Sequence, residues 1–158
     1  MKFYKMEEDD DLALKIKKIA NELGLSHYVD IQPRFLAKPA KNNVGSVHKW
    51  NDVSATLTGN ETSVVVAVYP QAFERVDEET QEFWIRNLLS QIKYDFDKDK
   101  ITIDKDLLTI PLSVYQTYGK LATDKKELEI HILNAIAEEE AERKRAEKEA
   151  KKNKKNKY

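Results

Sequence analysis

The residues best suited to chemistry stand at 94–106, where the sequence is YDFDKDKITIDKD. Asp95, Asp97 and Asp99 occupy alternate positions, and Asp106 falls at position 12 when Asp95 is counted as the first. An EF-hand loop of about 12 residues takes side-chain oxygen ligands for calcium from positions 1, 3, 5 and 12. The spacing of these four carboxylates therefore makes a calcium site one candidate function.

Several residues of the same stretch argue against an EF-hand. Lys100 stands at position 6, where the sharp turn of the loop needs Gly, and Thr102 takes a position that is usually aliphatic. Asp106 is one methylene shorter than the Glu that normally closes the loop. The run ITI at 101–103 predicts a strand where an EF-hand requires a second helix. The competing interpretation is a solvated, charged turn that joins a helix to a strand.

Other catalytic signatures are missing from the sequence. It contains no P-loop, no Gly-rich dinucleotide turn and no GxSxG motif, and the absence of Cys excludes thiolate nucleophiles and Cys-containing metal sites. His27, His48 and His131 have no second His at helical spacing, so we expect each to be a surface or core residue. These observations predict a protein that is not an enzyme and binds neither a metal nor a cofactor.

Four helices are predicted from apolar residues that recur at helical spacing, with acidic residues at the starts of the first two, Pro or Thr at the starts of the others, and Gly at two of their ends. Their expected starts are Asp9–Asp11, Asp77, Pro111 and Thr123, and the two Gly stops are Gly24 and Gly119. The buried faces are expected to hold Leu12, Ile16, Ile19 and Leu23 in the first helix, Trp84, Ile85, Leu88, Leu89 and Ile92 in the second, and Leu128, Ile130, Ile132, Leu133, Ala135 and Ile136 in the fourth.

Strands are predicted at 53–58, 63–69 and 101–103, and Gly59, Asn60 and Glu61 favour a hairpin between the first two. The run 63–69 is continuously apolar, which is typical of a central strand covered on both faces. The segment 26–52 contains two prolines and is expected to be irregular apart from a short strand near its start. The prediction is an α+β fold with a small sheet of three to four strands packed by helices.

A charged C-terminal segment follows this predicted domain. Apolar residues nearly vanish after Ala137, and pairs such as Glu139 and Arg143 at i,i+4 spacing favour a helix that continues into solvent and then frays. We therefore divide the chain into a globular domain, 1–137, and a helical extension with a basic tail, 138–158. The basic tail residues Lys151, Lys152, Lys154, Lys155 and Lys157 are candidates for contacts with nucleic-acid phosphates.

The window 83–119, FWIRNLLSQIKYDFDKDKITIDKDLLTIPLSVYQTYG, resembles the phage metallopeptidase family, a small zincin-like group. Members of that family carry an HEL-x-HI helix, then a short charged stretch and a strand, an Asp, and an apolar helix that ends in Tyr-Gly. Tyr118 and Gly119 correspond to that final pair with an offset of about one residue, and the resemblance covers roughly 100 residues by order of elements.

The family's catalytic residues are replaced in this sequence. On the resemblance, Asn87 and Gln91 stand where the two zinc-binding histidines would be, and Leu88 stands where the catalytic Glu would be. Asp106 falls near the family's downstream Asp. Amides are poor zinc ligands and Leu cannot serve as a general base, so the resemblance implies a zincin-like scaffold that has lost its zinc motif.

Composition and these motifs together predict a binding protein. A chain of 158 residues that is 41% hydrophobic and 35% charged can form one domain with a charged surface, and its acidic N-terminus argues against a signal peptide. We expect a cytoplasmic, non-catalytic protein-interaction module, encoded by a phage or mobile element and binding a host or virion protein through 26–52 and the C-terminal helix. A nucleic-acid-binding accessory protein and a calcium-binding protein are the alternatives.

Overall fold

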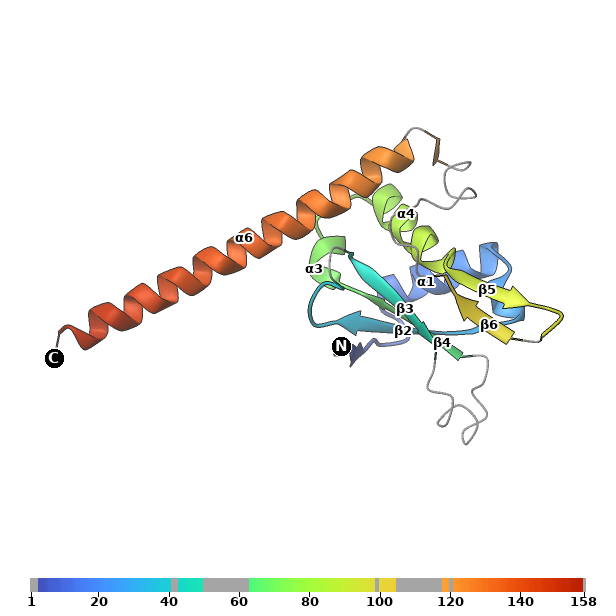
Figure 1. The fold of residues 1–158 in the computed structure, drawn as a ribbon, viewed down its shortest axis with the longest axis horizontal. Helices are drawn as coiled ribbons and strands as arrows, with labels where there is room; N and C mark the ends of the chain where they lie inside the picture. Colours follow the sequence, from blue (N-terminus) through green and yellow to red (C-terminus); the bar gives the residue numbers. More distant parts are fainter. Residues whose placement is uncertain are drawn as a thin grey trace.

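The computed structural model describes residues 3–40, 43–49, 63–98, 100–104, 118–119 and 121–157. Figure 1 shows an α+β body from which one long helix projects. The elements in chain order are β1 (Phe3–Lys5), α1 (Asp11–Glu22), the 3-10 turn η1 (Leu25–His27), β2 (Asp30–Leu36), β3 (Gly45–Lys49), β4 (Ser63–Val68), α3 (Pro70–Phe73), α4 (Glu78–Leu89), β5 (Ile92–Asp95), β6 (Lys100–Ile103) and α6 (Leu121–Lys155). The predicted fold class is thus confirmed.

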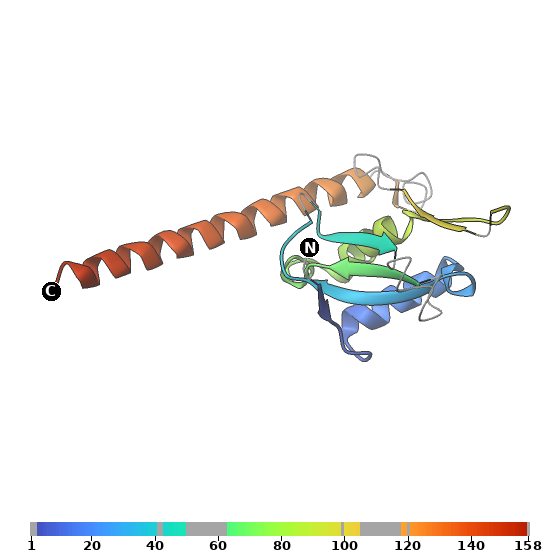
Figure 2. The same ribbon diagram turned by 60° about the horizontal axis from the view of Figure 1, so that its bottom comes forward.

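The main sheet has four strands in the order β1-β2-β4-β3, and its layers are visible in Figure 2. β2 and β4 run parallel, with Ile31 opposite Val64, whereas β3 is antiparallel to β4, with Val47 opposite Val66. Every residue of β4 is buried. The continuously apolar run therefore does form a central strand, as its composition predicted.

The segment 26–52 is more ordered than we predicted, because it supplies two strands of this sheet, β2 and β3. Pro33 lies inside β2, opposite Val66 of β4. β1 pairs with β2 only from Arg34 onward, so Pro33 stands where β2 has a neighbour on one side alone. A strand with one free side tolerates the missing N–H of proline, and for that reason the proline did not interrupt the strand.

Two capped helices, α1 and α4, pack on the sheet and on each other. The Asp10 carboxylate accepts a hydrogen bond from the backbone N–H of Leu12, and the Asp77 carboxylate accepts one from the N–H of Thr80. Both caps agree with the predicted helix starts. The predicted face of α1 is partly wrong, since Leu23 is 42% exposed and the helix ends there, before Gly24 turns the chain at φ 74°.

The second helix is shorter than predicted. α4 ends at Leu89, and Ile92 begins the hairpin of β5 and β6, in which it lies opposite Ile103. Ile92 falls four residues after Leu88, so its position fits a helix as well as a strand. The charged turn at 96–98 consequently joins two strands and not a helix to a strand, although ITI forms a strand as expected.

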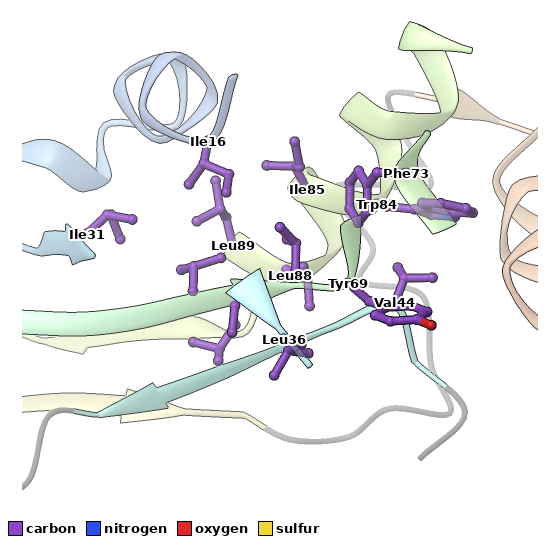
Figure 3. Packing of buried hydrophobic residues seen from close by; sticks show 14 of the residues in the cluster. Ile16, Ile31, Leu36, Val44, Tyr69, Phe73, Trp84, Ile85, Leu88 and Leu89 are labelled. Atoms are coloured by element: carbon purple, nitrogen blue, oxygen red, sulfur yellow. The ribbon is translucent and has the colours of Figure 1, made fainter. Parts of the chain in front are cut away.

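The core lies between the sheet and the helices (Figure 3). Ile16 of α1 and Ile85 and Leu89 of α4 are fully enclosed there. The ring of Trp84 meets that of Phe73 at 5.3 Å between centroids, and its Nε1 donates to the backbone oxygen of Lys125 at 3.2 Å. Trp84 thus connects α4 both to α3 and to the first turns of the long helix α6.

The long helix α6 differs from its prediction at its start and on its buried face. It begins at Leu121, before the expected cap Thr123, and it continues past residue 137 as predicted, reaching Lys155. Leu128, Ile130 and Ala135 are exposed. Leu133 and Ile136 are buried as predicted, and the face that packs on the body also holds Ala122, Lys125 and Glu129.

Some predictions fall outside the residues that the structure describes: the strand at 53–58, the turn at 59–61, the helix from Pro111, and the positions of Asp99 and Asp106. Gly119, which was predicted to end that helix, has a positive φ of 58°. No helix in the described part of the chain combines the length and the apolar character that crossing a membrane requires.

Candidate functional site

Of the positions that resemble the zinc motif, Asn87 and Leu88 lie on the inner face of α4, and Gln91 follows the end of this helix. Leu88 is buried, and it packs so closely over Gly45 of β3 that a Cβ atom at Gly45 would lie 2.5 Å from Leu88 Cδ1. Asn87 and Gln91 are also buried, and the backbone oxygen of Gln91 accepts a hydrogen bond from Asp104 N–H. Leu88, the position at which the resemblance would place a general base, is therefore an enclosed apolar residue.

Asn87 is the polar residue of this face with an unmet hydrogen-bonding group. Its Oδ1 atom is buried and accepts no hydrogen bond from any residue that the structure describes. Within the same described residues, no group of three or more His, Cys, Asp or Glu side chains could hold a metal ion. α4 is thus a packed helix with one buried amide, Asn87, and a second buried amide, Gln91, just after its end.

Two aspartates of the candidate calcium loop, Asp95 and Asp97, lie at the end of the β5–β6 hairpin. Asp95 Oδ1 accepts hydrogen bonds from the backbone N–H groups of Asp97 and Lys98, at 3.0 and 3.3 Å. This is an Asx turn, in which a carboxylate replaces the backbone acceptor that a tight turn requires. Asp95 therefore closes the hairpin turn, and its flanking elements are strands, whereas an EF-hand loop is flanked by helices.

Three aromatic rings gather at the surface beside this turn; we call Tyr28, Tyr94 and Phe96 the aromatic patch. Tyr28 and Tyr94 stack with their centroids 5.4 Å apart and their planes 23° apart. Phe96 meets Tyr28 and Tyr94 edge-on, at 5.1 and 4.9 Å between centroids. Tyr28 remains 46% exposed and Phe96 68% exposed, so the patch presents its rings to solvent.

The local sequence explains why these rings meet. In the hairpin register, Ile92 and Tyr94 share one face with Ile103 and Ile101, and the opposite face carries Lys93, Thr102, Asp95 and Lys100. Ile92 and Ile101 are buried, so the apolar face of the hairpin turns toward the body. Tyr28 ends the 3-10 turn after Gly24, and this turn brings its ring against Tyr94. Sequence reasoning did not find the patch, although the period-2 alternation was a signal for the hairpin that carries Tyr94.

A hollow of about 510 Å³ adjoins the patch at Tyr28. Its lining includes polar groups from α1 and from the start of β2, among them Lys17, Asn21 and Asp30. The Asp30 carboxylate already accepts hydrogen bonds from Gln32 Nε2 at 2.7 Å and from Ser63 Oγ at 3.1 Å. The exposed rings therefore have a polar margin, which is the usual anatomy of a protein-binding surface.

The long helix α6 is attached to the body by polar as well as apolar contacts. Glu129, only 3% exposed, accepts a hydrogen bond from Val44 N–H at 2.8 Å through Oε1, and its Oε2 lies 3.1 Å from Lys126 Nζ. Lys125 is also buried and donates to Thr80 Oγ1 at 3.2 Å. These contacts tie α6 to the start of β3 and to the first turn of α4.

Beyond Leu133 and Ile136, a single ion pair marks the place where α6 leaves the body. Arg75 donates from Nη1 and Nη2 to the two carboxylate oxygens of Glu139, at 3.0 and 2.5 Å. The side-chain hydrogen bond from Arg75 lowers the pKa of Glu139, and the same bond raises the pKa of Arg75. Glu139 is thus paired with Arg75 and not, as its spacing suggested, with Arg143.

This pairing predicts a measurable change at Glu139. Because its pKa in the folded protein lies below the ordinary value, the stabilisation from the pair is present at neutral pH and is lost as the pH falls through the lowered pKa. The variant Arg75→Ala should raise the pKa of Glu139 in an NMR titration of the side-chain carboxyl carbon. The matched variant Arg143→Ala should leave it unchanged, and an equal shift in both variants would contradict the assignment of the pair to Arg75.

Comparison of the chain with family models, with curated proteins and with solved structures finds no match.

Proposed function

We propose that this protein is a non-catalytic protein-interaction module that binds its partner through the aromatic patch. The observation that carries the proposal is the gathering of Tyr28, Tyr94 and Phe96 at the surface from two remote segments. Tyr is enriched among the residues that dominate binding energy at protein interfaces. The resemblance to a phage family favours a host or virion protein as the partner.

The position of Phe96 supports a binding role over a purely structural one. Tyr94 alone is sufficient to fasten the hairpin to Tyr28, because these two rings stack directly. Phe96 lies past the end of β5 and keeps two thirds of its surface in water. Burying an aromatic ring of this size in an interface is strongly favourable, so an exposed ring that is already held in place by two others is well prepared for binding.

The inner face of α4 supports the non-catalytic part of the proposal. Leu88 is apolar and enclosed, and the neighbouring inward-facing side chains of Asn87 and Gln91 are neutral amides. Such a set offers neither a nucleophile nor a general base. The role of this helix is to pack the scaffold that presents the patch.

The test uses three forms of the full chain as bait to capture partner proteins in cells of the proposed host. These forms are the wild type, Phe96→Ala and Leu14→Ala. Leu14 is an exposed apolar residue of α1 and serves as the matched control. Wild type and Leu14→Ala should capture the same partner, and Phe96→Ala should bind that partner, once purified, about 30-fold more weakly, as expected for a hot spot of about 2 kcal/mol. Equal affinity of all three forms for every captured protein would refute the proposal.

A further inference from the structure

Four lysines in the distal part of α6 lie along one face of the helix. Lys144, Lys148, Lys151 and Lys155 follow one another at intervals of four, three and four residues, and α6 is helical over all of them. With about 100° of rotation per residue, these four lysines lie within an arc of roughly 60°, and Lys152 lies about 40° beyond its edge. We call these five residues the lysine face.

The acidic residues of the same segment are placed mostly elsewhere. Glu142 and Glu149 fall on the opposite side of the helix, and Glu140 and Glu147 lie along one margin of the lysine face. All five lysines are exposed, and within the described part of the chain none of them lies in an ion pair. Their charges are therefore available to a ligand.

The helix is also held in a position to present this face. Glu129, Leu133 and Ile136 fix its first half on the body, and the Arg75–Glu139 pair holds the place where it leaves. From Ala141 to Lys155 every residue is exposed, and Figure 1 shows this part of α6 extending away from all other elements. The lysine row is thus formed before any ligand arrives, and about 16 Å separate its first and last members along the axis.

We propose that the lysine face binds the phosphate backbone of a nucleic acid without reading its sequence. A straight row of unpaired cations complements a polymer with regularly spaced anions, and binding is driven by release of the counterions condensed on it. An anionic membrane surface fits less well, since the side of α6 opposite the lysines holds Glu142, Glu149 and Ala146 and lacks the large apolar residues that insert into lipid.

This inference concerns a different surface from the aromatic patch and goes beyond the proposed protein-interaction function. It also changes the set of residues that the composition of the tail suggested. Lys148 and Lys144 join the site, whereas Lys154 lies about 60° outside it, beyond Lys151, and Lys157 follows the end of the helix. Spacing along a helix, and not the density of lysines, defines the site.

The experiment titrates the full chain into a fluorescent 20-base-pair DNA duplex and follows anisotropy between about 50 and 200 mM salt. If all five lysines contact phosphates, the logarithm of the association constant should fall with the logarithm of salt concentration with a slope of about −4 to −5. No binding at low salt, or a slope near zero, would overturn the proposal. Binding to phosphatidylserine vesicles without binding to the duplex would also overturn it, in favour of a lipid surface.

A permuted variant tests whether binding depends on the arrangement of the lysines on the helix or only on their number. The variant carries Lys148→Glu, Glu149→Lys, Ala150→Lys and Lys151→Ala, which keep both the composition and the net charge of the chain. Of the four lysines that lie within the arc of roughly 60°, only Lys144 and Lys155 remain. Circular dichroism should show the same helix content, and DNA affinity at 100 mM salt should fall at least tenfold with a shallower slope. Unchanged affinity and slope would mean that net charge, and not the lysine face, binds the duplex.

Discussion

Replacing Gly45 by Ala should lower the free energy of unfolding by about 2–3 kcal/mol, the range expected for an extra methyl group forced into a well-packed core. A Cβ at this position would lie 2.5 Å from Leu88 Cδ1 and 2.8 Å from the backbone oxygen of Ala67. Leu88 could move at some cost in packing. The oxygen of Ala67 belongs to the central strand β4 and cannot move without disturbing the sheet.

Gly24→Ala is the matched control for Gly45→Ala. Gly24 has a φ of 74°, and a Cβ there would meet nothing within 4 Å, so its cost is conformational only, about 1 kcal/mol. Urea unfolding of both variants measures the difference. The double variant Gly45→Ala with Leu88→Ala should remain less stable than Leu88→Ala alone, because the contact with Ala67 persists. A Gly45→Ala protein within about 0.5 kcal/mol of wild type would show that the close packing of β3 under α4 is misplaced.

Replacing Glu129 by Ala should lower the free energy of unfolding by about 2–3 kcal/mol, because it leaves the buried Val44 N–H without an acceptor and separates Lys126 from its carboxylate. Glu129→Gln keeps an oxygen that can accept from Val44 and should cost about half as much. The exposed neighbour Glu127→Ala is the control and should change stability by less than about 0.5 kcal/mol. Equal unfolding midpoints in urea for Glu127→Ala and Glu129→Ala would contradict the role assigned to Glu129.

The sequence contained enough local information to predict some elements and too little to predict others. Asp77 and the apolar run of β4 were recognised because capping and burial on both faces leave a signature within a few residues. The positions of Ile92 and Tyr94 fit both the helical and the strand periodicity. Only their pairing with Ile103 and Ile101 shows that they form a strand. That pairing depends on residues across a turn, which a helical wheel does not consider.

The packed face of α6 was only partly predicted, for a different reason. Lys125 and Glu129 were not among the residues expected on the buried face, since charged residues are seldom buried. Their burial is possible only because Thr80 and Val44, both remote in the sequence, supply hydrogen-bonding partners. Leu128 fits the apolar pattern equally well and is nevertheless exposed. The choice between the two faces rests on polar contacts that no apolar pattern contains.

The two candidate binding surfaces also differ in whether the sequence alone could have predicted them. The lysine face could have been derived from the sequence, since the spacing from Lys144 to Lys155 is visible there once a helix is assumed. The aromatic patch could not, because Tyr28 and Phe96 come together only through the turn after Gly24 and the register of the hairpin. Asp95 was singled out as a possible calcium ligand, and in the structure its carboxylate accepts hydrogen bonds from the backbone of its own turn.

The continuity of α6 across residue 137 has a consequence for how its length is determined. Starting a helix is the unfavourable step, and adding a residue to an existing one is nearly neutral. Because the body fixes the turns between Ala122 and Glu139, every later turn extends a helix that has already been started. The distal part can therefore be lengthened or shortened by whole turns without any change in the body, so that the reach of the protein becomes a property independent of its fold.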